Sequence, residues 1–149
     1  MRDVVVGHLD AFFAQQREPE GCSMAAFPSR ERNAFFAHWN KILSKQTVTI
    51  RTIPTDGQIA GNVLCWEQED RRFIGYWFGK VYWHRGVATR ALAAFLKVVA
   101  ARPVFACVAA HNVASVRVLE KCGFAPCGAA TVQVEESGDV VEEWLFRLV

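Results

Sequence analysis

A cation and a glycine stand directly before an apolar stretch with helical spacing. A turn that contains Arg85 and Gly86 is expected to open a helix at residues 87–89, where the first backbone N–H groups have no partner inside the helix. These amides, the positive end of the helix dipole and the arginine would converge on one point. The pattern therefore predicts a binding site for a phosphate group.

Two common phosphate motifs are absent from this turn. The chain has no Gly-x-x-x-x-Gly-Lys-Ser/Thr loop, and residues 86–88 lack the third glycine of a dinucleotide fingerprint. The remaining interpretations are a different kind of pyrophosphate site or a plain tight connection between two elements.

Periodicity and turn signals predict a mixed α/β order of elements. We expect a capping-box start at Ser29 for the second helix, and a solvated turn over residues 67–72. Residues 137–139 should form the turn of a C-terminal hairpin. The expected helices cover residues 7–18, 29–43, 87 to the Arg102-Pro103 stop, and 112–122; the expected strands cover 46–53, 58–66, 73–78, 104–108, 130–134 and 140–148.

The strand over 73–78, the helix after it and the strand over 104–108 form a crossover unit. The two strands should therefore be parallel, with the Gly86 turn at the carboxyl end of the first, where ligands bind preferentially. Asn112 is a natural N-cap for the next helix, and Gly123 is a natural left-handed residue after its end. Phe124 should then pack back on Leu119.

Composition limits the class of protein. With 149 residues and 52% hydrophobic content, residues 1–149 are expected to form one domain with a continuous core. A net charge of +2 with scattered basic residues argues against nucleic-acid binding. The five cysteines lack Cys-x-x-Cys spacing and mostly sit in apolar runs, which predicts reduced, buried thiols, no metal and a cytoplasmic location. No stretch is long enough to cross a membrane.

Two stretches, residues 75–92 (Gly-Tyr-Trp-Phe-Gly-Lys-Val-Tyr-Trp-His-Arg-Gly-Val-Ala-Thr-Arg-Ala-Leu) and 110–124 (Ala-His-Asn-Val-Ala-Ser-Val-Arg-Val-Leu-Glu-Lys-Cys-Gly-Phe), together resemble one known family. It is the GNAT superfamily of acetyl-CoA-dependent N-acyltransferases, and the chain is most similar to the branch that acetylates ribosomal-protein N-termini. The resemblance covers residues 58–128. It implies a mixed, mostly antiparallel sheet with a splayed parallel pair flanked by helices, and direct transfer of acetyl from acetyl-CoA to a primary amine.

The resemblance also implies how the cosubstrate acetyl-CoA is held. The family's loop, Gln/Arg-x-x-Gly-x-Gly/Ala, falls on residues 83–88, with His84 where a glycine is common. Asn112 matches an asparagine that hydrogen-bonds the pantetheine arm, although a plain N-cap is the other interpretation. By the same resemblance, the pyrophosphate is bound by backbone amides of His84, Arg85, Gly86, Val87, Ala88 and Thr89, and the pantetheine pairs with main-chain groups of Tyr76, Trp77 and Phe78.

The two usual catalytic groups of many relatives are missing, because Cys107 and Leu119 occupy their positions. Ser115 matches a serine near the CoA sulfur, so we expect a hydrogen-bond or proton donor there; a serine that only closes the first helical turn is the alternative. Cys107 should be an inert thiol. Candidates for the base are a water chain to a carboxylate and the side chains of Glu67, Glu69, Asp70, His84 and His111, of which His111 precedes Asn112 and titrates near neutrality.

The acceptor is a protein N-terminus, a polyamine-like metabolite or an amino sugar, with residues 20–32 expected as a loop over it. A CoA-binding sensor or scaffold without catalysis is the rival reading, and a nucleotide-binding fold is the third. Relatives begin with a longer strand than residues 1–6 supply, so a homodimer that covers this sheet edge is an expectation.

Overall fold

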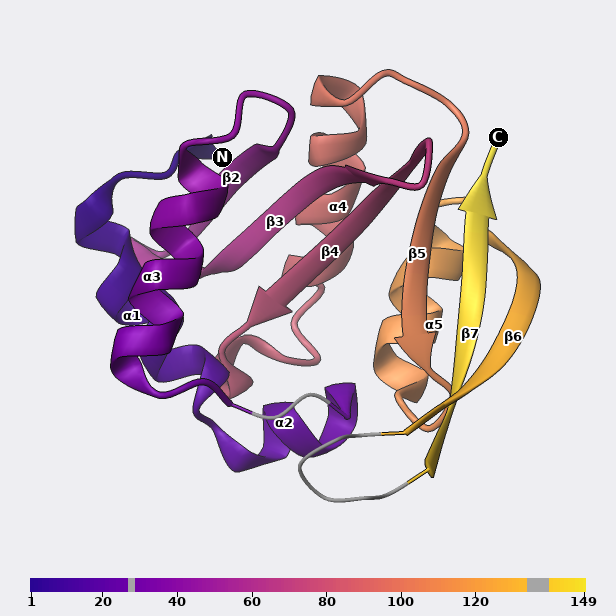
Figure 1. Cartoon of the computed structure of the whole chain (residues 1–149), viewed down its shortest axis with the longest axis horizontal. Coiled ribbons are helices and arrows are strands. Elements are labelled where there is room, and N and C mark those ends of the chain that lie inside the picture. The colour runs from indigo at the N-terminus through magenta and orange to yellow at the C-terminus, as the bar shows by residue number, and fades with distance from the viewer. Residues whose placement is uncertain (27–28, 134–139) are drawn as a thin grey trace.

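The computed structural model describes residues 1–26, 29–133 and 140–149 (Figure 1). Short two- and three-residue elements occur at the N-terminus and before the Gly86 turn. In chain order the elements are β1 (Arg2–Asp3), the 3-10 helix η1 (Val6–His8), α1 (Leu9–Gln16), α2 (Pro19–Ala25), α3 (Arg32–Leu43), β2 (Thr49–Thr55), β3 (Gln58–Gln68), β4 (Arg71–Phe78), the 3-10 helix η2 (Lys80–Tyr82), α4 (Val87–Val98), β5 (Val104–Ala109), α5 (Val113–Lys121), β6 (Ala125–Gln133) and β7 (Val140–Leu148).

The described strands form one sheet in the order β1-β2-β3-β4-β5-β7-β6. Every neighbouring pair is antiparallel except β4 and β5, which are parallel. These two strands are in register only where Arg72 meets Val104 and Phe73 meets Phe105, and they diverge beyond that point (Figure 1). The expected mixed, mostly antiparallel sheet with a splayed parallel pair is confirmed.

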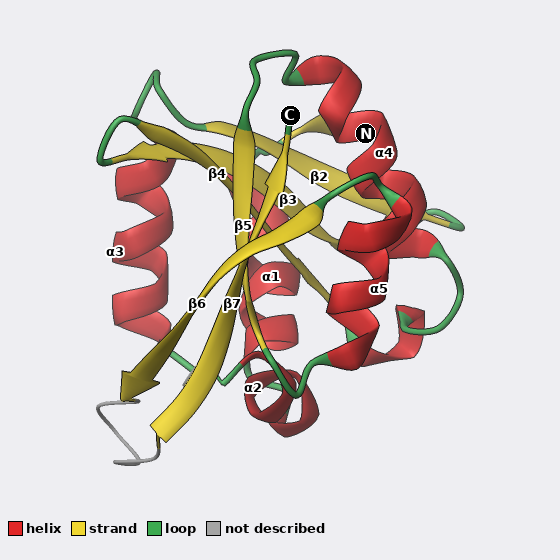
Figure 2. Ribbon diagram, turned by 90° about the vertical axis from the view of Figure 1, so that its right-hand side faces the viewer, coloured by secondary structure: helices red, strands yellow, loops and turns green. Residues whose placement is uncertain are grey.

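Helices cover both faces of the sheet, and each face has its own apolar core. In Figure 2, α3 and α1 lie on one side of the strands and α4 and α5 on the other. The α1/α3 core contains Leu9, Phe12, Phe13, Phe35, Trp39 and Ile50. The larger α4/α5 core is built on Leu92, Phe95, Val104, Leu119 and Phe146, among others.

The N-terminal helices differ from the expected ones. α1 is shorter than residues 7–18, because Pro19 begins a separate helix, α2, instead of only ending the first. Proline is well suited to this position, since its missing N–H would have no partner in the first turn. The expected loop over residues 20–32 therefore contains a helix. The capping box expected at Ser29 is also wrong, because α3 begins at Arg32 with Glu31 as its N-cap.

The turns between strands are tighter than expected. β3 and β4 extend through most of residues 67–72 and leave only Glu69 and Asp70 in the turn, with φ angles of 52° and 63°. Two left-handed residues match the twist of a two-residue hairpin. β6 begins at Ala125, before the expected residue 130. Residues 134–139, which include the expected turn, lie outside the described residues.

The caps expected for α5 are confirmed. Asn112 Oδ1 accepts a hydrogen bond of 3.3 Å from the Ser115 N–H. Gly123 has a φ of +93°, and the Phe124 N–H donates to the Leu119 carbonyl at 3.0 Å. This is the bond of a Schellman close, and both of its apolar side chains are buried. α4 ends at Val98, before the expected stop at Arg102-Pro103.

The five cysteines are all free, but only Cys65 is buried. The expectation of buried thiols is wrong for Cys107 and Cys127, which are exposed. Cys107 alternates with core residues of β5 and so faces the opposite side of the sheet, where α1 and α3 cover only the β2–β4 half (Figure 1). Among the described residues, no helix is long and apolar enough to span a membrane.

Gly61 of β3 is required by the close approach of β4. It pairs with Phe78, and an added Cβ would meet the Trp77 carbonyl oxygen and lie 2.9 Å from the Cα of Phe78. We expect Gly61→Ala to lower the free energy of unfolding by about 1–3 kcal/mol in urea denaturation, because backbone must shift to make room. Gly7→Ala is the matched control, since nothing lies within 4 Å of its added Cβ. Equal stability of the two variants would contradict this account.

Candidate functional site

A cleft of about 690 Å³ lies where β4 and β5 diverge. This volume is typical of a small-molecule or cofactor site. Its walls come from α2, the end of β4, the turn before α4, the first turn of α4, and α5 along its length from Val113 to Lys121. The lining residues are Gly21, Met24, Ala25, Tyr76, Trp77, Phe78, Tyr82, Trp83, His84, Gly86, Val87, Ala88, Thr89, Asn112, Val113, Ala114, Ser115, Arg117, Val118 and Lys121.

The turn before α4 contains two left-handed residues. Gly86 has a φ of +74° and His84 a φ of +60°. Only glycine adopts this conformation without steric cost, which explains why the position of His84 favours a glycine. The Trp83 indole N–H donates to the Phe78 carbonyl at 3.0 Å and so ties the turn to the end of β4.

The start of α4 presents free amides to the cleft. The first bond of the helix runs from the Arg90 N–H to the Gly86 carbonyl at 3.1 Å. The N–H groups of Val87, Ala88 and Thr89 have no acceptor in the part of the chain that the structure describes. All three residues line the cleft, so the cleft wall carries unpaired N–H donors at the start of a helix, the kind of group that binds anions.

The side chain of Arg85 does not take part in this site. Its guanidinium pairs with Asp56 in the β2–β3 turn at 3.2 Å, and its carbonyl accepts a 3.2 Å bond from Arg90. The expected cation therefore does not come from Arg85. Two other cations, Arg117 and Lys121 of α5, line the cleft instead. Their spacing of four residues on one helix face is a signal that sequence reasoning missed.

The main chain of β4 faces the cleft only at alternate residues. The Trp77 carbonyl lies against Gly61 of β3, and the Gly79 N–H donates to the Ala60 carbonyl at 2.9 Å. By the alternation of an antiparallel ladder, Tyr76 and Phe78 then direct their main-chain groups toward the gap. The geometry therefore does not support the expected pantetheine pairing for Trp77, and leaves the main chain of Tyr76 and the Phe78 N–H, because the Phe78 carbonyl already accepts from the Trp83 indole.

Ser115 and Asn112 meet at the start of α5. Asn112 lines the cleft while capping the helix, so its side-chain oxygen is engaged and its amide N–H groups have no described acceptor. Ser115 Oγ lies 2.7 Å from the phenolic oxygen of Tyr76, 39 positions earlier in the chain. Burial is the main reason that the pKa of Tyr76 is raised to about 12. This pair of hydroxyls was not predicted.

The candidate bases are spread unequally around the cleft. Glu69 and Asp70 lie in the turn before β4, and Glu67 forms a 3.0 Å ion pair with Arg72, so all three are at the opposite end of β4 from the cleft (Figure 1). These three are not at the site. His84 lines the cleft.

His111 is exposed and is not among the cleft-lining residues. Its Nε2 lies 2.8 Å from the Ser23 carbonyl. A carbonyl only accepts, so Nε2 carries a proton and only Nδ1 could act as a base. This bond connects the loop before α5 to α2.

The two residues at the usual catalytic positions are unsuited to proton transfer. Leu119 is 1% exposed and packs in the α4/α5 core. Partial burial, with smaller contributions from Glu143 and Cys127, raises the pKa of Cys107 to about 11. The expectation that Cys107 is a protonated thiol agrees with this shift.

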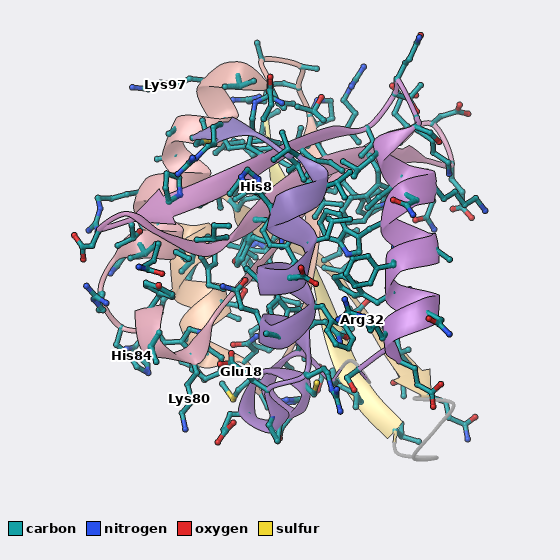
Figure 3. All side chains as sticks on the ribbon, turned by 90° about the vertical axis from the view of Figure 1, so that its left-hand side faces the viewer. His8, Glu18, Arg32, Lys80, His84 and Lys97 are labelled. Carbon is teal, nitrogen blue, oxygen red and sulfur yellow. The ribbon has the colours of Figure 1, made fainter. Side chains whose placement is uncertain are left out.

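An apolar wall bounds the cleft on the side of α2. The Trp77 indole donates to the Gln15 carbonyl at 3.1 Å, and its ring lies 3.1 Å from where a Cβ on Gly21 would stand. Met24 and Ala25 continue this wall. Outside it, Lys80 pairs with Glu20 at 3.0 Å; Figure 3 shows Lys80 and His84 at this end of the molecule.

Comparisons with known proteins bear on this site. No curated protein sequence matches the chain. A spermidine N-acetyltransferase from Vibrio cholerae, solved with CoA and spermine, aligns with a TM-score of 0.83 and 15% identity over 99% of this chain and 92% of that one. A ribosomal-protein-alanine N-acetyltransferase from Brucella melitensis aligns with a TM-score of 0.79 and 15% identity over 99% of this chain and 98% of that one.

A third solved structure, a ribosomal L7/L12 alpha-N-protein acetyltransferase in complex with CoA, aligns with a TM-score of 0.82 and 16% identity over 99% of this chain and 92% of that one. At these identities the structures establish a shared fold. The sequence model "Acetyltransferase (GNAT) domain" matches residues 1–125, which is most of the chain. The protein therefore belongs to the GNAT acetyltransferase family.

Proposed function

We propose that this protein transfers an acetyl group from acetyl-CoA directly to a primary amine, either a protein N-terminus or a small-molecule amine. The observation that carries the proposal is the row of free amides at Val87, Ala88 and Thr89, which opens onto the gap between β4 and β5. A pyrophosphate needs such donors, and an extended pantetheine needs a strand edge without a partner. Solved structures of the same fold contain CoA.

In this proposal each part of CoA has its own partners. The pyrophosphate accepts hydrogen bonds from the amides of residues 84–89, and Arg117 and Lys121 offset its negative charge. The pantetheine lies along the main chain of Tyr76 and Phe78, and the Asn112 amide donates to it. The Gly86 turn fits this role, since a Cβ there would come within 2.7 Å of the Arg90 guanidinium.

The chemistry requires two proton movements. The neutral amine forms a C–N bond with the thioester carbonyl carbon, and the C–S bond breaks with its electron pair leaving on sulfur. The amine gives up a proton to water or to the imidazole of His84 or His111, and the thiolate needs a hydrogen-bond or proton donor. We assign this last role to Ser115, which lines the cleft at the start of α5.

A CoA-binding sensor without catalysis is the second candidate. It is favoured by Leu119, which is buried in the core, and by Cys107, whose pKa is raised to about 11, because neither can serve as acid or base near neutral pH. The two candidates differ in one observable, which is release of CoA that depends on an amine.

Thiol release from acetyl-CoA should therefore increase when amines are added. The panel contains a peptide N-terminus, a polyamine and an amino sugar, and release is followed with a thiol reagent. Gly86→Asp should abolish CoA binding in calorimetry, because it adds a side chain and a negative charge at the pyrophosphate.

Gly57→Asp is the matched control, since its φ of +77° imposes the same backbone strain in open space. CoA binding without amine-dependent release would favour the sensor. Unchanged CoA affinity in Gly86→Asp would refute the assigned loop.

Ser115→Ala should lower kcat by about 10- to 100-fold, the usual range for loss of one donor to a developing charge. The KM for acetyl-CoA should stay nearly constant, because the backbone N–H that binds Asn112 is retained. Ser44→Ala is the control: Ser44 is exposed at the end of α3, and its hydroxyl donates to the Lys41 carbonyl. Steady-state kinetics with an unchanged kcat in Ser115→Ala would remove Ser115 from the mechanism.

A further inference from the structure

We propose that Tyr76 is a positioning residue that donates its phenolic hydrogen to Ser115 Oγ, and thereby directs the Ser115 hydroxyl hydrogen into the cleft. The inference rests on the proposed function, because it assigns that hydrogen to the sulfur of CoA. The observation behind it is the 2.7 Å distance between Tyr76 Oη, on β4, and Ser115 Oγ, in the first turn of α5.

The pair spans the two walls of the cleft. Tyr76 packs against the α4/α5 core, with its ring centroid 6.1 Å from that of Phe78. Ser115 is held from the other side by its backbone bond to Asn112. Within the described residues, Ser115 Oγ has no partner other than Tyr76 Oη. Both side chains line the cleft.

The relative acidity of the two hydroxyls sets the direction of the bond. A phenol is a much stronger acid than an aliphatic alcohol, so it is the better donor and the alcohol the better acceptor. If Ser115 were the donor instead, the only acceptor near the phenolic hydrogen among the described residues would be the Ser115 carbonyl, 3.4 Å from Tyr76 Oη. The shorter bond therefore belongs to Tyr76 as donor, and the hydrogen of Ser115 is left unpaired.

Tyr76 keeps its proton throughout the catalytic cycle in this proposal. Burial raises its pKa to about 12, the Ser115 hydrogen bond acts in the opposite direction, and Cys122 is the other titratable group beside it. A thiol titrates well below this value, so the phenol would not protonate the thiolate outright. The Tyr76 phenol therefore donates to Ser115 Oγ at every stage of the reaction. When the C–S bond breaks, the sulfur keeps the electron pair and accepts a hydrogen bond from the Ser115 hydroxyl. Solvent then supplies the proton that converts the thiolate to a thiol.

This arrangement supplies a donor where the usual one is missing. Leu119, seven residues after Asn112, has no hydroxyl and is buried. Tyr76 instead reaches Ser115, in the first turn of α5, from β4 on the opposite wall of the cleft.

Binding of CoA and of desulfo-CoA, measured by calorimetry at pH 7 and pH 9, tests the inference without turnover. A donor that favours the thiolate lowers the pKa of the bound thiol, so the affinity for CoA rises with pH through the range of the free thiol. Desulfo-CoA has no sulfur, so its affinity changes with pH only through groups other than the thiol. The ratio of the two affinities therefore isolates the ionisation of the thiol. The affinity ratio of CoA to desulfo-CoA should rise with pH in the wild type and approach about fivefold, the effect of one net hydrogen bond, only above the pKa of the free thiol.

In Tyr76→Phe this rise should disappear, while the affinity for desulfo-CoA stays unchanged and kcat falls with a constant KM. The double variant Tyr76→Phe/Ser115→Ala should have the same kcat as Ser115→Ala alone, because in this proposal Tyr76 acts only through the Ser115 hydroxyl. A full pH response in Tyr76→Phe, or an additive loss in the double variant, would overturn the inference and leave the proposed function intact. A wild type that binds neither ligand would refute the proposed function itself.

Discussion

The cleft depends on the separation of two parallel strands. β4 and β5 share only two registered positions, after which the sheet opens. In a closed sheet the main-chain groups of Tyr76 and Phe78 would be satisfied by β5, and no ligand could enter. The gap is kept open from both sides, since each strand has an antiparallel partner on its outer edge that holds it in place. The hydrogen bonds that the sheet forgoes are the ones that we assign to CoA.

The alternation of side chains along β4 then divides the cleft into two compartments. Tyr76 points to the α4/α5 side and meets Ser115, whereas Trp77 points to the α1/α2 side and donates to the Gln15 carbonyl. The first compartment has the amides of α4 and the cations of α5. The second is apolar, with Gly21 allowing α2 to approach the Trp77 ring. In the proposed reaction CoA occupies the first compartment and the amine enters from the second, so that the two reactants meet at β4.

Local signals were sufficient to predict the elements whose ends are set by nearby residues. Asn112, Gly123 and Phe124 fix both ends of α5 within a short stretch, and the structure has them as expected. The left-handed Gly86 before α4 is a signal of the same kind. By contrast, α2 has too few apolar residues in a regular period to be recognised. Pro19 at its start is also ambiguous, because a proline can either end one helix or begin the next.

Features that depend on distant pairing could not be predicted. Arg85 turns away from the anion site because Asp56, 29 positions earlier, lies next to it in the fold. The contact between Tyr76 and Ser115 joins residues 39 positions apart and depends on how far β4 and β5 splay. The resemblance to a family indicated where the proposed site lies, whereas the partners of individual side chains required the structure.

Amide hydrogen exchange, read by NMR with and without saturating CoA, tests the central claim most directly. The N–H groups of Val87, Ala88 and Thr89 have no described acceptor and should exchange rapidly in the free protein. We predict that CoA slows their exchange strongly, because the pyrophosphate becomes their acceptor, and that the turn at residues 84–86 is slowed with them. CoA that binds while residues 84–89 exchange at their original rates would contradict the account.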